Sequence, residues 1–207
     1  KAANISDLNY LKNNLYADAY MLRSGSSLYI FDESSIKSYC NTFVPSNINN
    51  RFICDNALCT GDVNYYTNSP CPGGDLELNR DNFLASLNNG SNFGIGKFHF
   101  IYHMDHGGSQ GIGTSGIDKG NGVNKVDMGS LTNGTSYQIF MSGSCHSANF
   151  TEDCIGKYYL TNSNGGGGTL FLSNSISLVR LLSEKKKRTL SGIPVIFSTI
   201  RIRHPHA

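Results

Sequence analysis

Two stretches decide the fold of this chain: Phe98-His99-Phe100-Ile101-Tyr102 and Tyr137-Gln138-Ile139-Phe140-Met141. Each is short, rich in aromatic and β-branched residues, and closely followed by glycine or serine, which is typical of a buried strand that ends in a loop. The first leads into His103-Met104-Asp105-His106-Gly107-Gly108, and the second into Ser142-Gly143-Ser144-Cys145-His146-Ser147. We therefore expect two strands with a histidine and a cysteine beyond their carboxyl ends.

The pairing of His106 with Cys145 predicts a catalytic chemistry. In an open α/β sheet, reactive groups gather beyond the carboxyl ends of the strands, so parallel neighbouring strands would bring these two side chains together. A histidine within hydrogen-bond reach acts as base to a cysteine nucleophile and lowers the pKa of its thiol. Attack on a carbonyl also requires N–H donors for the oxyanion, and the backbones of Gly107 and Cys145 are the candidates.

Short apolar runs alternate with helical patterns along the rest of the chain, which predicts an α/β domain with a mostly parallel sheet covered on both faces. Apolar residues three or four apart favour a helix over residues 5–22. We expect the glycines at 165–168 to let the chain pass close to the rim of the active site. Further strands are expected at 27–31, 51–55, 169–173 and 193–200, further helices at 36–43, 79–87, 126–131, 148–160 and 175–182, and long loops at 56–74 and 107–122.

Composition excludes some partners and favours an exported protein. The formal charge of +2 and the absence of an apolar run of about 18 residues give no indication of nucleic-acid binding or of a membrane span. The basic run at 185–188 reads as a solvated helix end or turn. Only 15% of residues are charged, which favours an exported protein. The chain starts without the apolar core of a signal peptide, so we expect it to be a piece of a longer protein.

The chain contains six cysteines, at positions 40, 54, 59, 71, 145 and 154. The first four lie among Asn, Gly and Pro, where disulfides would stabilise a loop. If Cys145 stays reduced, one other cysteine is left over, and Cys154 is the expected one.

The two strand-end segments resemble those of the gingipain-type branch of the caspase-like cysteine peptidases. Residues 102–108 are similar to its strand–x-x-His-Gly segment, and residues 142–150 to its small-x-Cys-x-x-x-x-Phe segment. The glycine run with the following 169–175 resembles a later strand and Asn-containing turn of that family, and residues 79–90 resemble its helix before the histidine strand. The similarity covers roughly residues 50–180.

This resemblance implies a caspase-like α/β/α sandwich over residues 1–183, with 1–50 poorly matched, the upstream sheet missing or unrecognisable, and 184–207 an irregular basic tail. It implies a cysteine endopeptidase acting through a thioester, with His106 as general base and acid, Cys145 as nucleophile, and oxyanion donors from Gly107 and Cys145. An acidic residue orients the histidine in some members, and the candidates are Glu33, Asp55 and Glu77. The implied protein is bacterial, secreted or at the cell surface, and acts on proteins or peptides, with its neighbouring domains absent from this chain. It needs no cofactor, although some members of the family bind structural calcium.

Two other functions stay open. A zinc site would use His103, His106, Cys145, His146 or Cys154, although positions three apart on a strand face opposite ways. A non-catalytic, peptidase-like binding module would keep the fold with idle residues. We expect structural roles for His103 and for Asp105, which would cap its loop.

Overall fold

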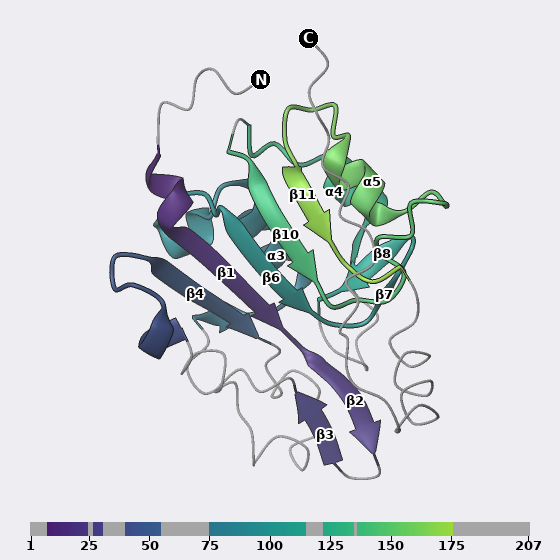
Figure 1. Cartoon of the computed structure of the whole chain (residues 1–207), viewed down its shortest axis with the longest axis horizontal. Coiled ribbons are helices and arrows are strands. Elements are labelled where there is room, and N and C mark those ends of the chain that lie inside the picture. Colours follow the sequence, from purple (N-terminus) through teal and green to yellow (C-terminus); the bar gives the residue numbers. More distant parts are fainter. Residues whose placement is uncertain are drawn as a thin grey trace, which may run out of the picture.

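The core of the molecule is a six-stranded sheet, seen in a computed structural model that describes residues 8–24, 27–30, 40–54, 75–114, 122–134 and 136–175. Every pairing in this sheet is parallel, and the strand order is β11-β10-β6-β1-β4-β5 (Figure 1). The strands are β1 (Asn13–Asp18), β4 (Asn49–Cys54), β5 (Leu76–Glu77), β6 (Phe100–Met104), β10 (Gln138–Ser142) and β11 (Gly168–Leu172). The predicted α/β fold with a mostly parallel sheet is confirmed.

The prediction of a helix over residues 5–22 is wrong where the structure describes it. After a 3₁₀ turn, η1 (Asn9–Lys12), the chain forms β1 and then β2 (Tyr20–Ser24). Along β1, Asn13, Leu15 and Ala17 are buried in alternation. That period of two is the pattern of a strand. β1 lies between β4 and β6, and its backbone is paired on both sides. This pairing outweighs the helical spacing. β1 and β4 form the part of the sheet that was expected to be missing or unrecognisable, and only the β4 segment was predicted as a strand, at 51–55.

Two helices pack against one face of the sheet, α3 (Arg80–Asn88) and α5 (Ile155–Leu160), and a third, α4 (Lys125–Gly129), packs against α5. Phe140 of β10 contacts both Phe83 of α3 and Tyr159 of α5, with ring centroids 6.1 and 5.4 Å apart. Asn79 caps α3 as predicted, its side chain accepting a hydrogen bond from the Asn82 N–H. A second 3₁₀ turn, η3 (Ser91–Phe93), then leads toward β6.

The segment from Gly107 to Gly122, predicted as a loop, contributes to a small antiparallel sheet. Its strands are β7 (Gly107–Gly108), β8 (Gly111–Gly113) and β9 (Gly122–Asn124). Glycine has no side chain to give a strand its period of two, so the pattern is invisible in the sequence. In Figure 1, β7 and β8 lie near the carboxyl ends of the central strands.

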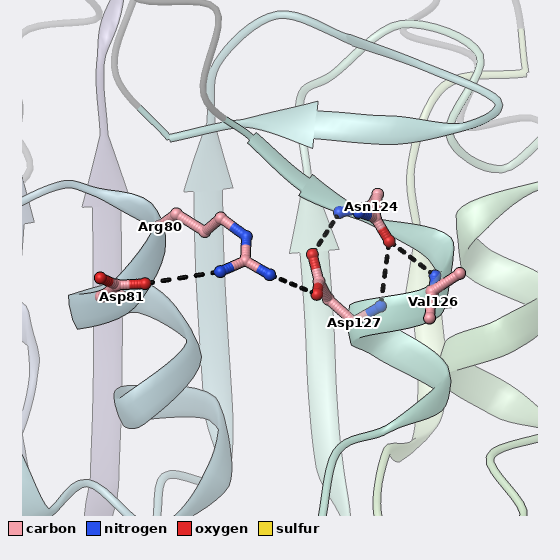
Figure 2. A network of polar contacts seen from close by, with 5 residues as sticks. All are labelled: Arg80, Asp81, Asn124, Val126 and Asp127. Carbon is pink, nitrogen blue, oxygen red and sulfur yellow. Dashed lines mark hydrogen bonds and ion pairs between the residues drawn. The ribbon is translucent and has the colours of Figure 1, made fainter.

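A polar network joins this small sheet to α3 (Figure 2). Asn124 is the last residue of β9 and the N-cap of α4, and it forms a capping box with Asp127. Asp127 also accepts a hydrogen bond from Arg80 of α3 at 2.5 Å. The outer strand is thereby connected to the helix that packs on the central sheet.

The glycines at 166–168 approach neighbouring backbone closely, but at the amino ends of the strands rather than at the carboxyl ends, where we expected them. A Cβ on Gly166 would lie 2.0 Å from the Leu131 carbonyl oxygen, and one on Gly168 would lie 2.4 Å from that of Gln138. Gly168 and Gln138 pair at the starts of β11 and β10. These glycines therefore serve packing at the amino ends of the strands, away from the predicted active-site rim.

The predicted strand at 27–31 is observed as β3 (Ser27–Ile30), which pairs with β2. Among the described cysteines, Cys40, Cys145 and Cys154 carry free thiols, whereas Cys54 is in a disulfide. Cys154 is unpaired as expected, but the expectation that it is the one left over beside Cys145 is wrong, because Cys40 is free as well. No helix within the described ranges is long and apolar enough to cross a membrane. The predictions for residues 5–7, 31–39, 56–74, 176–183 and 184–207 lie outside the described residues.

Candidate active site

The register of β6 and β10 brings the two predicted catalytic residues together beyond the carboxyl ends of these strands. These strands are parallel neighbours, and His103 pairs with Ser142 at the last aligned position. His106 and Cys145 each lie three residues beyond that pair. Both follow the carboxyl ends of adjacent strands, as the sequence predicted.

The two loops that follow these strands are in direct contact. We call residues 105–113 the histidine loop and residues 143–150 the cysteine loop. A Cβ added to Gly107 would lie 2.7 Å from the Cβ of Ser144. Because Gly107 follows His106 and Ser144 precedes Cys145, this contact lies beside both predicted catalytic residues. Only glycine at position 107 lets the loops approach this closely.

The backbone of His106 is fixed from both sides. Its N–H donates to the Oδ1 atom of Asp105 at 2.5 Å, and its carbonyl accepts a hydrogen bond from the Gly113 N–H at 2.7 Å. Asp105 is fully buried and lies beneath Gly113, where an added Cβ would meet its carboxylate at 2.4 Å. Asp105 therefore caps the histidine loop, in agreement with its predicted structural role.

The small sheet sets the direction of the Gly107 N–H. In an antiparallel pair, hydrogen-bonded and non-hydrogen-bonded residue pairs alternate. The Gly113 N–H bond to the His106 carbonyl marks a hydrogen-bonded position, so the next pair, Gly107 with Ile112, is a non-hydrogen-bonded one. The Gly107 N–H therefore points away from β8, in a direction in which it can serve a ligand.

The cysteine loop turns sharply just after Cys145. His146 has φ of 53°, the left-handed region, and is the one described non-glycine residue with a positive φ. Such a conformation is disfavoured for a residue with a side chain and is found at tight functional turns. Cys145 is half-buried and is not in a disulfide. The turn thus holds a thiol at the carboxyl edge of the sheet.

His103 lies in the core rather than in the site. It is fully buried, and its Nε2–H donates to the Gly113 carbonyl at 2.7 Å while Nδ1 accepts from the Ser142 hydroxyl at 2.9 Å. Burial lowers the pKa of His103 to about 4, so the ring is neutral near pH 7. With both nitrogens bonded to protein, His103 has no atom for the zinc site considered above. No three metal-ligating side chains gather at a potential metal site in the described segments.

Of the three acidic residues expected to orient the histidine, Glu33 and Asp55 lie outside the described residues. Glu77 is on β5, and β1 and β4 stand between it and β6, so three strand spacings, about 14 Å, separate the strands. The structure instead places Asp18 at the carboxyl end of β1, directly beside β6 and only 2% exposed. The helix prediction hid this residue, although the run Leu15-Tyr16-Ala17 before it also fits a strand.

Two further observations concern the surroundings of Asp18 and His106. Burial, and secondarily the charge of Asp18, raise the pKa of Tyr102 to about 12, so the carboxylate lies near the end of β6. The Nε2 atom of His106 is buried and has no hydrogen-bond partner among the residues that the structure describes. A buried nitrogen of this kind requires a partner, such as a carboxylate or a ligand.

Comparisons with known proteins concern the fold and the family of the chain. In overall fold the chain is similar to the crystal structure of the Arg-specific cysteine proteinase gingipain R, with a TM-score of 0.54 and 12% identity over 82% of this chain. It covers 33% of that protein, and so spans about a third of its length. A second solved structure, described as a protease, has a TM-score of 0.48 and 13% identity, with 83% of this chain and 30% of the other covered. No curated protein sequence matches the chain.

The sequence itself gives the family. The sequence model of peptidase family C25 matches residues 6–191, which is most of the chain and includes both strand-end motifs. The match also includes β1 and β4, the region that resembled the family least by inspection. The resemblance to gingipain-type cysteine peptidases is thereby confirmed, and the chain belongs to peptidase family C25.

Proposed function

We propose that this chain is the catalytic part of a cysteine endopeptidase in which Cys145 is the nucleophile and His106 the general base and acid. The thiolate of Cys145 attacks the carbonyl carbon of a peptide bond, and the C–N bond then breaks while His106 protonates the leaving amine. A water molecule, deprotonated by His106, attacks the resulting thioester. The C–S bond breaks, releasing the acid and restoring the thiolate.

One observation carries this proposal: the parallel register of β6 and β10. Because His103 pairs with Ser142, the segments that bear His106 and Cys145 leave the sheet side by side. The contact of Gly107 with Ser144 keeps them together. Membership of family C25 supports the same chemistry, because that is a family of cysteine peptidases.

The backbone supplies the oxyanion donors in this proposal. The Gly107 N–H points away from β8, and the Cys145 N–H lies in the adjoining loop. Two preorganised N–H groups stabilise the tetrahedral intermediate without any reorganisation during the reaction. Each step of the mechanism then has its group in the two loops.

We also assign the role of orienting acid to Asp18. It is the last residue of β1, the strand next to β6, and is buried beside Met104 at the end of β6. His106 Nε2 is a buried nitrogen that a carboxylate would satisfy. A hydrogen bond between them fixes the ring and stabilises the imidazolium that forms during attack. The substrate is a protein or peptide, and the family likeness supports a bacterial enzyme that is secreted or held at the cell surface.

The first test is the reactivity of the Cys145 thiol. Iodoacetamide labelling at several pH values, mapped by mass spectrometry, should show rapid alkylation of Cys145 near pH 7 and roughly tenfold slower alkylation in His106→Ala, since the imidazolium stabilises the thiolate. Cys154 is a matched internal control, because it is a free but buried thiol. Alkylation of Cys145 no faster than that of a model thiol would contradict the proposed dyad.

The second test is hydrolysis of an unfolded protein and a mixed peptide library. Cys145→Ala and His106→Ala should each abolish cleavage, whereas Cys154→Ala should retain it. Cleavage that survives Cys145→Ala would exclude the thioester route. Absence of cleavage and of enhanced alkylation in the unmodified chain would favour the non-catalytic binding module.

A further inference from the structure

The carbonyl oxygen of Ser144, which belongs to the same peptide group as the Cys145 N–H, is surrounded by hydrogen-bond donors. The Ser173 hydroxyl lies 3.1 Å from it, and the Asn174 side-chain amide and the Ser147 hydroxyl each lie 3.4 Å from it. Asn174 also donates to the preceding carbonyl, that of Gly143, at 3.0 Å. Ser173 and Asn174 directly follow β11, so a separate strand end holds this peptide.

The direction of this carbonyl determines the direction of the Cys145 N–H. No peptide bond in the described chain is cis, and in a trans peptide the N–H and the C=O point in opposite directions. Donors that hold the carbonyl therefore also fix the N–H, which points in the opposite direction within the same peptide plane. The N–H of Cys145 is one of the two oxyanion donors in the mechanism proposed above.

A buried row of side chains supports the Ser173 hydroxyl. It runs from His103 Nδ1 through the hydroxyls of Ser142, Ser144, Ser147 and Ser173, at successive distances of 2.9, 2.5, 3.0 and 2.5 Å. Ser144 and Ser147 are fully buried, and Ser142 is 5% exposed. Water therefore does not compete for the bonds among Ser142, Ser144 and Ser147, whereas Ser173, at the end of the row, is half-buried.

The number of protons in this row fixes the direction of its bonds. Neutral His103 accepts at Nδ1 because its Nε2 carries the proton donated to a carbonyl, so the row ends in an acceptor on each side: this Nδ1 and the Ser144 carbonyl. Four hydroxyl protons cannot fill five contacts. One contact must therefore lack a proton. If it is the 3.0 Å contact between Ser144 and Ser147, both terminal acceptors and both 2.5 Å contacts receive one. In that arrangement Ser147 donates to Ser173, and Ser173 donates to the Ser144 carbonyl.

We propose that Ser173 and Asn174 are positioning residues that hold the Ser144–Cys145 peptide with its N–H aimed at the substrate oxyanion. Neither side chain touches the reacting atoms, because both act through the Ser144 and Gly143 carbonyls. This inference rests on the proposed peptidase function, and it adds a requirement that the dyad alone does not have. Loss of the Ser173 hydroxyl should impair acyl transfer while leaving the thiolate of Cys145 intact.

Two reactions of the same thiol separate these effects. Alkylation by iodoacetamide forms a C–S bond and releases iodide, without an oxyanion, whereas peptide hydrolysis passes through one. Ser173→Ala should therefore lower kcat for the peptide by about tenfold to a hundredfold, the range expected when an oxyanion donor is weakened or misdirected. The alkylation rate of Cys145 and the KM should stay within about twofold of the unmodified chain.

Ser173→Thr is the conservative variant, and it should recover most of the lost kcat because it keeps the hydroxyl. Ser130→Ala, at an exposed serine, is the matched control and should change neither reaction. Asn174→Ala should act in the same direction as Ser173→Ala, and thermal unfolding shows whether each variant is folded at the assay temperature.

The outcomes are distinct. A selective loss of hydrolysis in Ser173→Ala, restored in Ser173→Thr, supports the positioning role. Equal loss of hydrolysis and alkylation, or loss of neither, overturns it while the peptidase function stands. If the unmodified chain neither hydrolyses peptides nor alkylates faster than a model thiol, the proposed function fails, and this inference fails with it.

Discussion

The histidine loop and the cysteine loop meet at one edge of the sheet but are held in different ways. Main-chain pairing in β7 and β8, with the Asp105 carboxylate beneath, holds the histidine loop. The cysteine loop is instead held by side chains: the Ser173 hydroxyl and Asn174 amide that follow β11, and a row of hydroxyls that reaches the His103 imidazole of β6. The first should therefore tolerate side-chain changes and be sensitive to added volume, and the second should respond to the loss of single polar groups.

The largest effect is expected where the two loops touch. Gly107→Ala places a Cβ 2.7 Å from the Ser144 Cβ and 3.0 Å from the Gly111 carbonyl, so the loops must separate. We expect kcat/KM for a peptide to fall by about a hundredfold or more, since a shift near 1 Å at reacting groups has this size of effect. Gly108→Ala is the control, because a Cβ there meets no atom within 4 Å. Equal activity of the two variants would show that the contact is dispensable.

The next effect concerns the base of the cysteine loop. The unfolded chain protonates His103 near pH 6.5, whereas burial lowers the pKa in the folded protein to about 4. Between these values the unfolded state binds more protons, so stability falls as pH drops from 6.5 toward 4. At pH 4.5 the loss should be about 2 kcal/mol.

His103→Gln tests this prediction, because glutamine does not titrate and offers both a donor and an acceptor. The free energy of unfolding, measured in urea at pH 7.5 and 4.5, should decrease less in the variant than in the unmodified chain. Equal decreases in the two proteins would show that His103 does not become protonated on unfolding.

A smaller effect is expected at the turn after Cys145. Relieving the left-handed conformation of His146 in His146→Gly should raise stability by up to about 1 kcal/mol with peptidase activity unchanged. Ser163→Gly, at an exposed residue without a positive φ, should instead lower stability slightly. A large loss of activity in His146→Gly would give its imidazole a role in the reaction.

The smallest effect should come from the outer support of the histidine loop. Arg80 is 42% exposed at its side chain, so Arg80→Ala should lower the free energy of unfolding by less than about 1 kcal/mol. Lys125→Ala, which removes another exposed ion pair near α4, is the comparison. A collapse of activity in Arg80→Ala would show that the network in Figure 2 governs the position of His106.

The strands of the central sheet differ in how far they could be predicted: β4 was expected at 51–55, whereas β1 was not expected at all. β6, β10 and β11 carry continuous apolar runs, and all three were expected. β1 mixes Asn13, Asn14 and Asp18 with apolar residues, because the paired asparagines bond across the sheet instead of packing in a core. Local spacing cannot show such pairing, since the partners lie far away in the sequence.

The candidate site divides in the same way. His106 and Cys145 were recognisable from short motifs beside glycine, whereas Asp18 depended on the order of strands. The serine row was equally hidden, because Ser173 and Ser147 become neighbours only when β10 and β11 pair. His106 and Cys145, which short sequence motifs identify, were predicted, whereas Asp18 and the serine row, which only tertiary contacts identify, were not.

The central position of β1 also has a consequence for how the protein folds as it is synthesised. β1 leaves the ribosome early, but one of its two neighbours, β6, is made only when residues 100–104 have been translated. Until then its edge can pair with β4 alone, and strand contacts between distant segments form slowly. An exposed strand edge is a site of aggregation, so the nascent chain passes through a vulnerable interval before His106 and Cys145 have been translated. Mutations in β1 should therefore lower the yield of folded protein even where they leave the finished active site unchanged.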